Sequence, residues 1–351
     1  MINRIHIFSF FYFLLLYLAA FFSFDVSNYN YLVEILFGSI AFLLFPLKKS
    51  FYILLYISVL FIFIFILTYK ASNIYYLITD LSLTAFIIFI IEKTKTINVY
   101  NLEAVLKFFY YLSIIYITLL LTSLFIPSFI VDDRFKGLGF SCNITSSIAL
   151  SICIYIYIYN RKFSNLIFII ITLILLLLFA KTRALLFGFP LILYYLNKNI
   201  GLKKTLFIFI PICTYIIIYL FPTLEKELRL STDDSFNTRA TIYIQMIEVL
   251  KNSLFVIPHG FNADQIYIDN FLGAKGFPVH NDFLKYIYNY GFLFILFLVY
   301  IGKSFINIIH NKTELILIIF AFSSNALQNA LFSVYIFVPF FFTLLLFKRN
   351  T

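Results

Sequence analysis

Residues 142–180 read CNITSSIALSICIYIYIYNRKFSNLIFIIITLILLLLFA, two apolar runs separated by the short polar segment Asn160-Arg161-Lys162. Each run is close to the roughly 20 residues that a helix needs to cross a bilayer. Both runs are continuous, whereas a strand of an outer-membrane barrel alternates apolar and polar residues over about ten positions. The stretch therefore predicts two neighbouring membrane helices joined by a short basic turn.

The rest of the chain has the same character. Its 351 residues are 63% hydrophobic, 21% aromatic and 12% charged, and its mean hydropathy is +0.99. An average soluble domain has about 25% charged residues, so this chain has too few polar side chains to cover a globule in water. We expect an integral membrane protein, all-α, folded as one polytopic helical domain over residues 1–351.

Twelve apolar runs predict about twelve transmembrane helices. They are residues 5–24, 31–47, 51–69, 73–91, 108–126, 142–159, 165–180, 184–196, 205–221, 283–302, 315–330 and 331–347. The run at 184–196 is short for a bilayer and contains Pro190, so a full crossing there stays open. The first run is long and has no small-residue cleavage site, which predicts a retained helix instead of a signal peptide.

The basic residues predict the orientation of these helices. With the N-terminus in the cytoplasm, the cytoplasmic segments hold fifteen lysines and arginines, and the short segments on the other side hold five. Because short cytoplasmic loops are enriched in Lys and Arg, we expect both termini to be cytoplasmic. Topology then accounts for the net charge of +10, and no nucleic-acid partner is needed to explain it.

One long segment on the outer side, residues 222–282, is polar and holds eight acidic against five basic residues. Insertions of this length usually have a function. Within it, Asn237 or Thr238 is predicted to cap a helix from Arg239 to about Asn252 that lies along the membrane surface. Its predicted apolar face consists of Ile242, Met246, Val249 and Leu250.

Several kinds of chemistry lack their usual sequence signals. The chain has no Walker A loop, no dinucleotide fingerprint, no His-Glu-x-x-His and no nucleophile elbow, so we expect no cofactor. The pairs Asp132-Asp133 and Asp233-Asp234 could bind a cation, but acidic pairs in loops are more often solvated, and we expect no metal site. Glu34 and Asp80 lie near predicted span ends, where either can reach the interface.

Four features of the predicted outer side can take part in chemistry. They are Arg134-Phe-Lys-Gly137-Leu-Gly-Phe-Ser-Cys-Asn143, Lys181-Thr-Arg183, Arg239 and His280-Asn281. Arginines at a membrane lip suit a diphosphate, and a cation at the start of a helix is unfavourable unless an anion binds nearby. A neutral histidine can accept a proton. The alternatives are arginines that anchor the chain to lipid headgroups and a structural histidine.

The order of these elements resembles the O-antigen polymerase and O-antigen ligase superfamily. The matching elements are Arg134-x-x-Gly137…Asn143, Thr182-Arg183-Ala184, the helix led by Arg239, Pro258-His-Gly260-Phe, and His280-Asn281-x9-Gly291. The resemblance covers residues 134–294, and the first five spans match only in kind. The family often has Ser-Arg-Gly at 182–184 and Gly, Thr or Tyr at Phe294, so these departures bear on the subfamily.

The resemblance implies a GT-C-like glycosyltransferase of the bacterial inner membrane that acts at the periplasmic face without metal or nucleotide sugar. Its substrate would be an oligosaccharide on undecaprenyl diphosphate. The implied roles are a base for His280, diphosphate binding for Arg183, Arg239 and, more weakly, Arg134, and support for Asn281, Gly260, Gly291 and Asn143. A chain-length regulator or other polysaccharide-assembly protein would be a partner.

Three functions remain open: a polymerase, a ligase and a flippase. A short chain of AT-biased composition favours a polymerase, which extends another lipid-linked repeat unit. The His280-Asn281-x9-Gly291 spacing favours a ligase, which transfers the glycan to lipid A core. A flippase for lipid-linked oligosaccharides would be expected to have cations within its spans. Sugar identity, linkage, anomeric outcome and oligomeric state cannot be read from the sequence.

Overall fold

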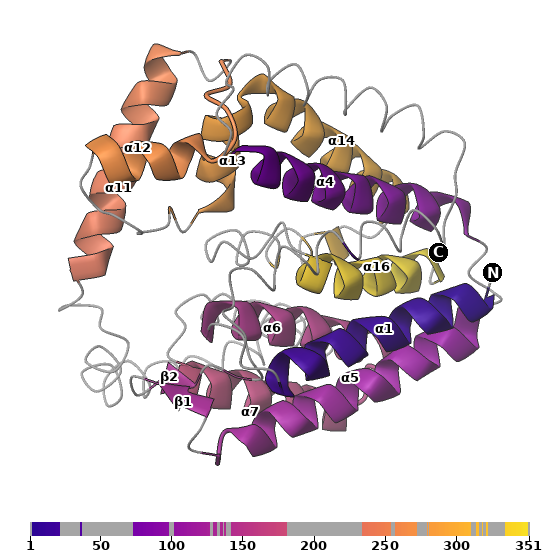
Figure 1. Cartoon of the computed structure of the whole chain (residues 1–351). Helices are drawn as coiled ribbons and strands as arrows, with labels where there is room; N and C mark the ends of the chain where they lie inside the picture. Colours follow the sequence, from indigo (N-terminus) through magenta and orange to yellow (C-terminus); the bar gives the residue numbers. More distant parts are fainter. Residues whose placement is uncertain are drawn as a thin grey trace, which may run out of the picture.

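The computed structural model describes residues 2–21, 36, 73–97, 102–126, 129–131, 134–135, 137, 142–180, 234–253, 257–271, 279, 281–309, 314–315, 318, 321 and 334–349. Apart from two strands of two residues each, every regular element in this part of the chain is a helix, which confirms the all-α class (Figure 1). The helices are α1 (Ile2–Phe21), α4 (Asn73–Thr96), α5 (Glu103–Ser123), α6 (Cys142–Tyr159), α7 (Phe163–Ala180), α11 (Asp234–Asn252), α12 (Ala263–Phe271), α13 (Asp282–Tyr290), α14 (Phe292–Ile308) and α16 (Val334–Arg349). The strands β1 (Ile130–Val131) and β2 (Arg134–Phe135) form an antiparallel hairpin.

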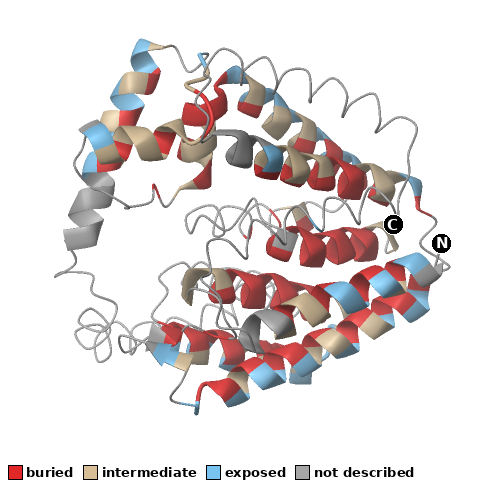
Figure 2. Cartoon of the chain, in the orientation of Figure 1, coloured by how far each residue is buried: buried red, intermediate tan, exposed pale blue. Residues whose placement is uncertain are grey.

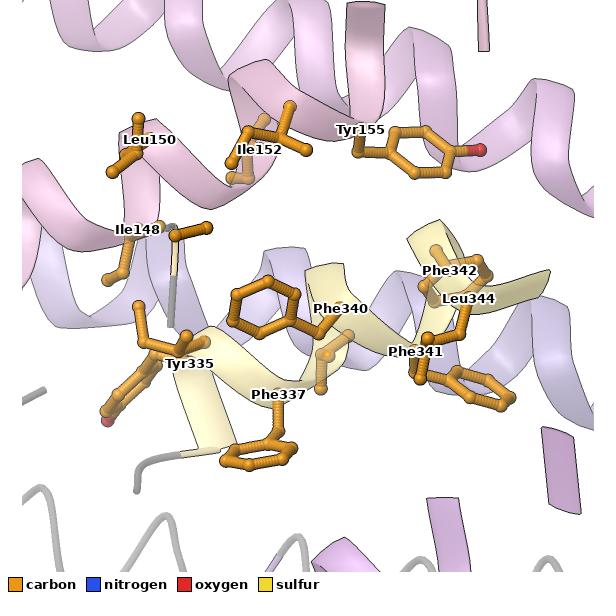
Figure 3. Packing of buried hydrophobic residues seen from close by; sticks show 14 of the residues in the cluster. Ile148, Leu150, Ile152, Tyr155, Tyr335, Phe337, Phe340, Phe341, Phe342 and Leu344 are labelled. Carbon is orange, nitrogen blue, oxygen red and sulfur yellow. The ribbon is translucent and has the colours of Figure 1, made fainter. Parts of the chain in front are cut away.

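Helix α16 lies in the middle of the bundle, between α4 and α14 on one side and α6 on the other (Figure 1). Its side chains are buried along almost its whole length (Figure 2). Apolar side chains of α6 and α16 face each other across this contact, as Ile152 and Phe340 illustrate (Figure 3). Phe109 of α5 stacks on Phe342 with ring centroids 3.8 Å apart. Aromatic rings from three helices therefore fill the centre of the core.

The outer surface of the bundle is apolar as well. Tyr111, Ile115 and Leu119 recur on one face of α5 and are 53%, 50% and 44% exposed, and α14 exposes Leu296 and Val299 in the same way. Large exposed apolar surfaces are unfavourable in water but suit contact with lipid. By length and composition, α5 and α6 are the described helices that could cross a membrane. The twelve crossings and the GT-C-like arrangement stay predictions.

Most helices that the structure describes agree with the predicted spans. Helix α6 coincides with the predicted residues 142–159, and α1, α4, α5, α7 and α16 overlap their predicted spans with shifts of a few residues at the ends. The predicted spans 51–69, 184–196 and 205–221 lie outside the described residues. Of 31–47 the structure describes only Leu36, and of 315–330 only Leu315, Ile318 and Ala321.

Two expectations differ from the structure. The predicted span 283–302 is not one helix, because the chain leaves the helical path at Gly291 and divides it into α13 and α14. Helix α11 begins at Asp234, so the predicted cap at Asn237 or Thr238 is wrong. Its apolar face was predicted correctly, since Ile242, Met246 and Leu250 are buried in a cluster with Ile268, Val279, Leu284 and Tyr288. That this helix lies along the membrane surface stays a prediction.

A basic cluster closes one end of the bundle, and we call it the inner end because it joins segments predicted to be cytoplasmic. The Lys348 ammonium donates to the carbonyls of Thr94, Lys95 and Ile97 at 2.9, 2.8 and 2.8 Å. An ammonium has three donors. Thr94 and Lys95 belong to the last turn of α4, where the helix leaves carbonyls unpaired, and Ile97 directly follows the helix. The C-terminal turn of α16 therefore caps α4.

Candidate functional site

The break between α13 and α14 is a turn that requires glycine. Gly291 has φ 54° and ψ −131°, a conformation that residues with a Cβ rarely adopt. Its N–H still donates to the carbonyl of Ile287 at 2.8 Å, which ends α13. A helix that ends in this way leaves the carbonyls of its last turn without partners inside the helix. The break therefore presents backbone acceptors to a neighbouring segment.

The loop that contains Pro258-His259-Gly260 supplies the donors. The N–H of His259 donates to the carbonyl of Tyr288 at 3.3 Å, and the N–H of Gly260 donates to that of Asn289 at 3.0 Å. Gly260 is itself at φ 107°, again in the region that favours glycine. Two elements of the family resemblance, separated by about 30 positions in the sequence, therefore form one hydrogen-bonded unit, which we call the 260–291 junction.

The Asn289 side chain ties α12 to this junction. Its Oδ1 accepts from the N–H of Asp264 at 3.0 Å, and its Nδ2 donates to the Asp264 carboxylate at 2.8 Å. Asp264 is the second residue of α12, where the N–H has no partner inside the helix. Both side chains are buried, at 1% and 4% exposure. Asn289 therefore caps α12 from another helix, and the pair satisfies polar groups that would be costly to leave unpaired.

His259 is held in one orientation. Its Nδ1 lies 3.0 Å from the carbonyl oxygen of Tyr288, and its ring stacks on the Tyr288 ring at 4.3 Å between centroids, with a 12° angle between planes. A carbonyl oxygen can only accept, so Nδ1 must carry the hydrogen. In the neutral ring Nε2 is then an acceptor. Among the described residues no partner occupies Nε2.

A second link joins the junction to α4. The hydroxyl of Tyr290 donates to the carboxylate of Asp80, and Lys285 and Asp264 are close enough to Asp80 to interact with it electrostatically. Asp80 was considered as an ionisable residue near a span end, and the structure gives it a specific hydrogen-bond donor. The first half of α4 is thereby fixed to the point where the tenth predicted span breaks.

The predicted site residues that the structure describes have structural surroundings. Asn281 is the N-cap of α13, with φ −153° and an Oδ1 that accepts from the N–H of Leu284 at 3.1 Å. Asn143 lies in the first turn of α6. Gly137 of the Arg134-x-x-Gly137 element has φ 75°, and a Cβ there would lie 2.3 Å from Thr145. The glycine therefore permits close approach of the loop to α6.

The predicted base and arginines are described less fully. His280 and Arg183 lie outside the described residues. The backbone of Arg134 lies in β2, and that of Arg239 lies in α11, but their side chains are outside the described part. Because α11 begins at Asp234, Arg239 falls in its second turn. The expectation that it faces the positive N-terminal end of a helix is therefore wrong, since the dipole effect fades beyond the first turn.

The described residues of the family resemblance form two groups, and both groups lie at the end of the bundle opposite the inner end (Figure 1). In the first group, Asn281 and Gly291 cap the two ends of α13, and Gly260 bonds to its residue Asn289. The last residue of α13, Tyr290, bonds to Asp80 in the first half of α4. Arg134 and Asn143 lie at the hairpin and the start of α6. We call this the outer end. In the part of the chain that the structure describes, no three His, Cys, Asp or Glu side chains are grouped as metal ligands would be.

The sequence reasoning missed His259. The Pro258-His-Gly260-Phe element was noted for the resemblance, yet only Gly260 was assigned a supporting role. The signal was the histidine itself beside a glycine, but a fixed ring nitrogen depends on the distant carbonyl of Tyr288, which no local pattern reveals. The helix break at Gly291 did have a local signal, since a glycine inside an apolar run lowers the expectation of a continuous helix.

The chain matches none of the protein-family models, curated proteins or solved structures with which it was compared. The family resemblance therefore depends on the quoted sequence elements, and the activity that it implies is a proposal.

Proposed function

We propose that the chain is a membrane glycosyltransferase that polymerises a surface polysaccharide. It would transfer a glycan from undecaprenyl diphosphate to the terminal sugar of another lipid-linked repeat unit at the periplasmic face. The observation that supports this most is the 260–291 junction. The Pro258–Phe261 loop and the Gly291 end of the His280-Asn281-x9-Gly291 element, which were identified separately in the sequence, are bonded to each other through the carbonyls of Tyr288 and Asn289.

The proposed chemistry assigns one step to each predicted residue. His280 takes the proton from the acceptor hydroxyl, the hydroxyl oxygen bonds to the anomeric carbon of the donor glycan, and the bond from that carbon to the diphosphate breaks. Negative charge grows on the departing lipid diphosphate, so Arg183 and Arg239 stabilise the transition state more than the ground state. Arg134 would assist them. Cleavage of the bond between the anomeric carbon and the diphosphate, which leaves as intact lipid diphosphate, drives the reaction without another energy source.

The position of the described elements is consistent with a one-sided site. Along α4, Asp80 bonds to the junction and Lys95 bonds to Lys348 at the inner end, and fifteen residues of helix separate them by about 22 Å. Along α6, Thr145 lies against Gly137, and Tyr159 bonds to Glu103 at the inner end. The site elements and the predicted cytoplasmic charges are therefore a bundle length apart.

A ligase is the second candidate, favoured by the His280-Asn281-x9-Gly291 spacing. The two reactions share a donor and a leaving group and differ in the acceptor. A flippase would move the same donor without forming a bond.

The glycan products that purified protein in lipid nanodiscs forms from a lipid-linked repeat unit distinguish these functions. A polymerase produces a ladder of longer lipid-linked glycans. A ligase produces no ladder, but it adds glycan to lipid A core when that acceptor is supplied. Recovery of the donor unchanged with both acceptors would contradict the transferase proposal, and movement of the donor across proteoliposomes by the same preparation would identify a flippase.

A further inference from the structure

We propose that His259 binds a hydroxyl group of the acceptor glycan through Nε2, and that it does so as a fixed hydrogen-bond acceptor separate from the base His280. This inference depends on the proposed function for the nature of the ligand. The orientation of His259 follows from the structure itself.

Three contacts fix the ring. The backbone N–H of His259 and its Nδ1 both donate to the carbonyl oxygen of Tyr288, at 3.3 and 3.0 Å. Its face lies on the Tyr288 ring with centroids 4.3 Å apart. A ring held on one edge and one face cannot turn to present Nδ1 elsewhere, so the nitrogen available to a ligand is Nε2. An acceptor that is already oriented loses little side-chain entropy when it binds a donor.

The surroundings suit a sugar. Sugars offer hydroxyl donors at their edges and C–H groups on their faces, and they pack well against aromatic rings. Tyr267 lies 5.6 Å from Tyr288 between ring centroids, and both Tyr267 and His259 are half-buried, so they reach the surface. Tyr288 itself is buried, so the aromatic surface near His259 is that of the half-buried Tyr267. A hydrogen-bond acceptor near a partly exposed aromatic ring is a typical arrangement for recognising polar ligands with apolar faces.

The position relative to the predicted base is also suitable. Val279, which directly precedes His280 in the chain, packs in one apolar cluster with Leu284 and Tyr288. The His259 ring stacks on the ring of Tyr288. The residue before the predicted base therefore belongs to the same buried cluster as Tyr288, on which the His259 ring stacks.

A pair of substitutions separates binding from structure. In His259→Asn the side-chain amide can still donate to the Tyr288 carbonyl, but nothing replaces Nε2. In His259→Gln the longer side chain places its amide near the position of Nε2, where its oxygen can accept. We measure the Kd of each variant for the free repeat-unit oligosaccharide, its KM for the acceptor, and its thermal unfolding midpoint.

We expect His259→Asn to raise Kd and KM about tenfold, the equivalent of one hydrogen bond, with kcat and the unfolding midpoint close to wild type. His259→Gln should retain Kd within about threefold, because it keeps an acceptor. Wild-type affinity in His259→Asn would overturn the inference. The inference would also be overturned if both variants lost affinity to the same extent and had equally lowered unfolding midpoints, because this result indicates a purely structural residue.

The same measurements separate this inference from the proposed function. If His259→Asn weakens oligosaccharide binding while wild-type protein transfers no glycan, the transferase proposal fails and the binding role of His259 stands. If the wild-type protein transfers glycan and His259→Asn binds the oligosaccharide as tightly as wild type, the binding role fails and the transferase proposal stands. Wild-type protein that neither binds nor transfers contradicts both.

Discussion

The two ends of the bundle use polar groups in different ways. At the inner end, charged side chains pair across helices: Arg349 with Glu103 at 2.6 Å and Arg161 with Glu314 at 2.9 Å. Lys348 uses all three of its donors on carbonyls. At the outer end, backbone groups and hydrogen bonds from Asn289 and Tyr290 to single carboxylates hold two turns of backbone. His259 keeps an acceptor that no described residue uses.

This difference separates a structural end from a candidate functional end. Groups whose hydrogen bonds are already made inside the protein stabilise helix contacts and have little to offer a ligand. A binding site needs side chains that are fixed and yet retain bonding capacity. In the described residues, the 260–291 junction combines both properties.

The largest effect should come from the arginines that are predicted to bind the diphosphate. Arg183→Lys and Arg239→Lys keep the charge but lose the planar fork that pairs with a diphosphate. We expect each to slow glycan transfer by about 10- to 100-fold, less than the loss of a whole transition-state donor. Full activity in both variants would mean that they anchor the chain to lipid. Arg349→Lys at the inner end is the matched control, and its activity should stay near wild type.

The next effect concerns the buried pair of the outer end. Asn289→Ala removes the partner of the Asp264 N–H and of its carboxylate, both buried, so we expect a loss of about 2 kcal/mol of stability. The measurement is the thermal unfolding midpoint in one detergent. Gln265→Ala, which removes a half-buried bond to Asp269 in the same helix, should have a much smaller effect. Equal shifts in the two variants would contradict the capping role of Asn289.

Two glycines of the same predicted span should respond with opposite signs. Gly291→Ala forces a Cβ into a conformation with φ 54°, which costs about 1–2 kcal/mol. Gly302 lies in the helical part of α14, and a Cβ there would meet no atom within 4 Å, so Gly302→Ala should be neutral or stabilising by up to about 1 kcal/mol. If both substitutions stabilise the protein, the helix is continuous at Gly291 and the junction is absent.

The smallest effect should come from the inner-end ion pair. Glu103 is 58% exposed in its pair with Arg349, and exposed pairs contribute about 0–1 kcal/mol. Arg349→Ala should therefore lower stability by less than about 1 kcal/mol. Transfer activity should be unchanged. A loss of activity comparable with that of Arg183→Lys and Arg239→Lys would show that the inner end also takes part in function.

The sequence predicted the helices and missed the junction for a physical reason. Apolar runs such as residues 142–159 show helix boundaries locally, because bilayer crossing depends on length and hydropathy. The apolar face of α11 was likewise readable from its spacing, although its partner was not. The junction depends on contacts between Gly260 and Asn289 and between Asn289 and Asp264, which are distant in sequence, so neither its existence nor the fixed ring of His259 could be predicted.

The start of α11 was misplaced for a different reason. Asn237 and Thr238 are good caps by residue type, but the structure continues the helix back to Asp234. Residue preference gives candidates for a helix start and does not choose among polar residues that follow one another closely. The same error placed Arg239 at a helix terminus, which shows how a boundary shift of one turn changes an electrostatic interpretation.

Glycan transfer by His280→Ala tests the central claim most directly. The control is His6→Ala, whose histidine lies in the predicted first span and packs against Phe108 of α5. Purified wild-type protein, His280→Ala and His6→Ala would be compared with one lipid-linked donor at equal protein amounts. We expect wild type and His6→Ala to produce the same products, and His280→Ala to be slower by at least about 100-fold while it folds and inserts normally. Unchanged products from His280→Ala would contradict the assignment of the outer end as the transfer site.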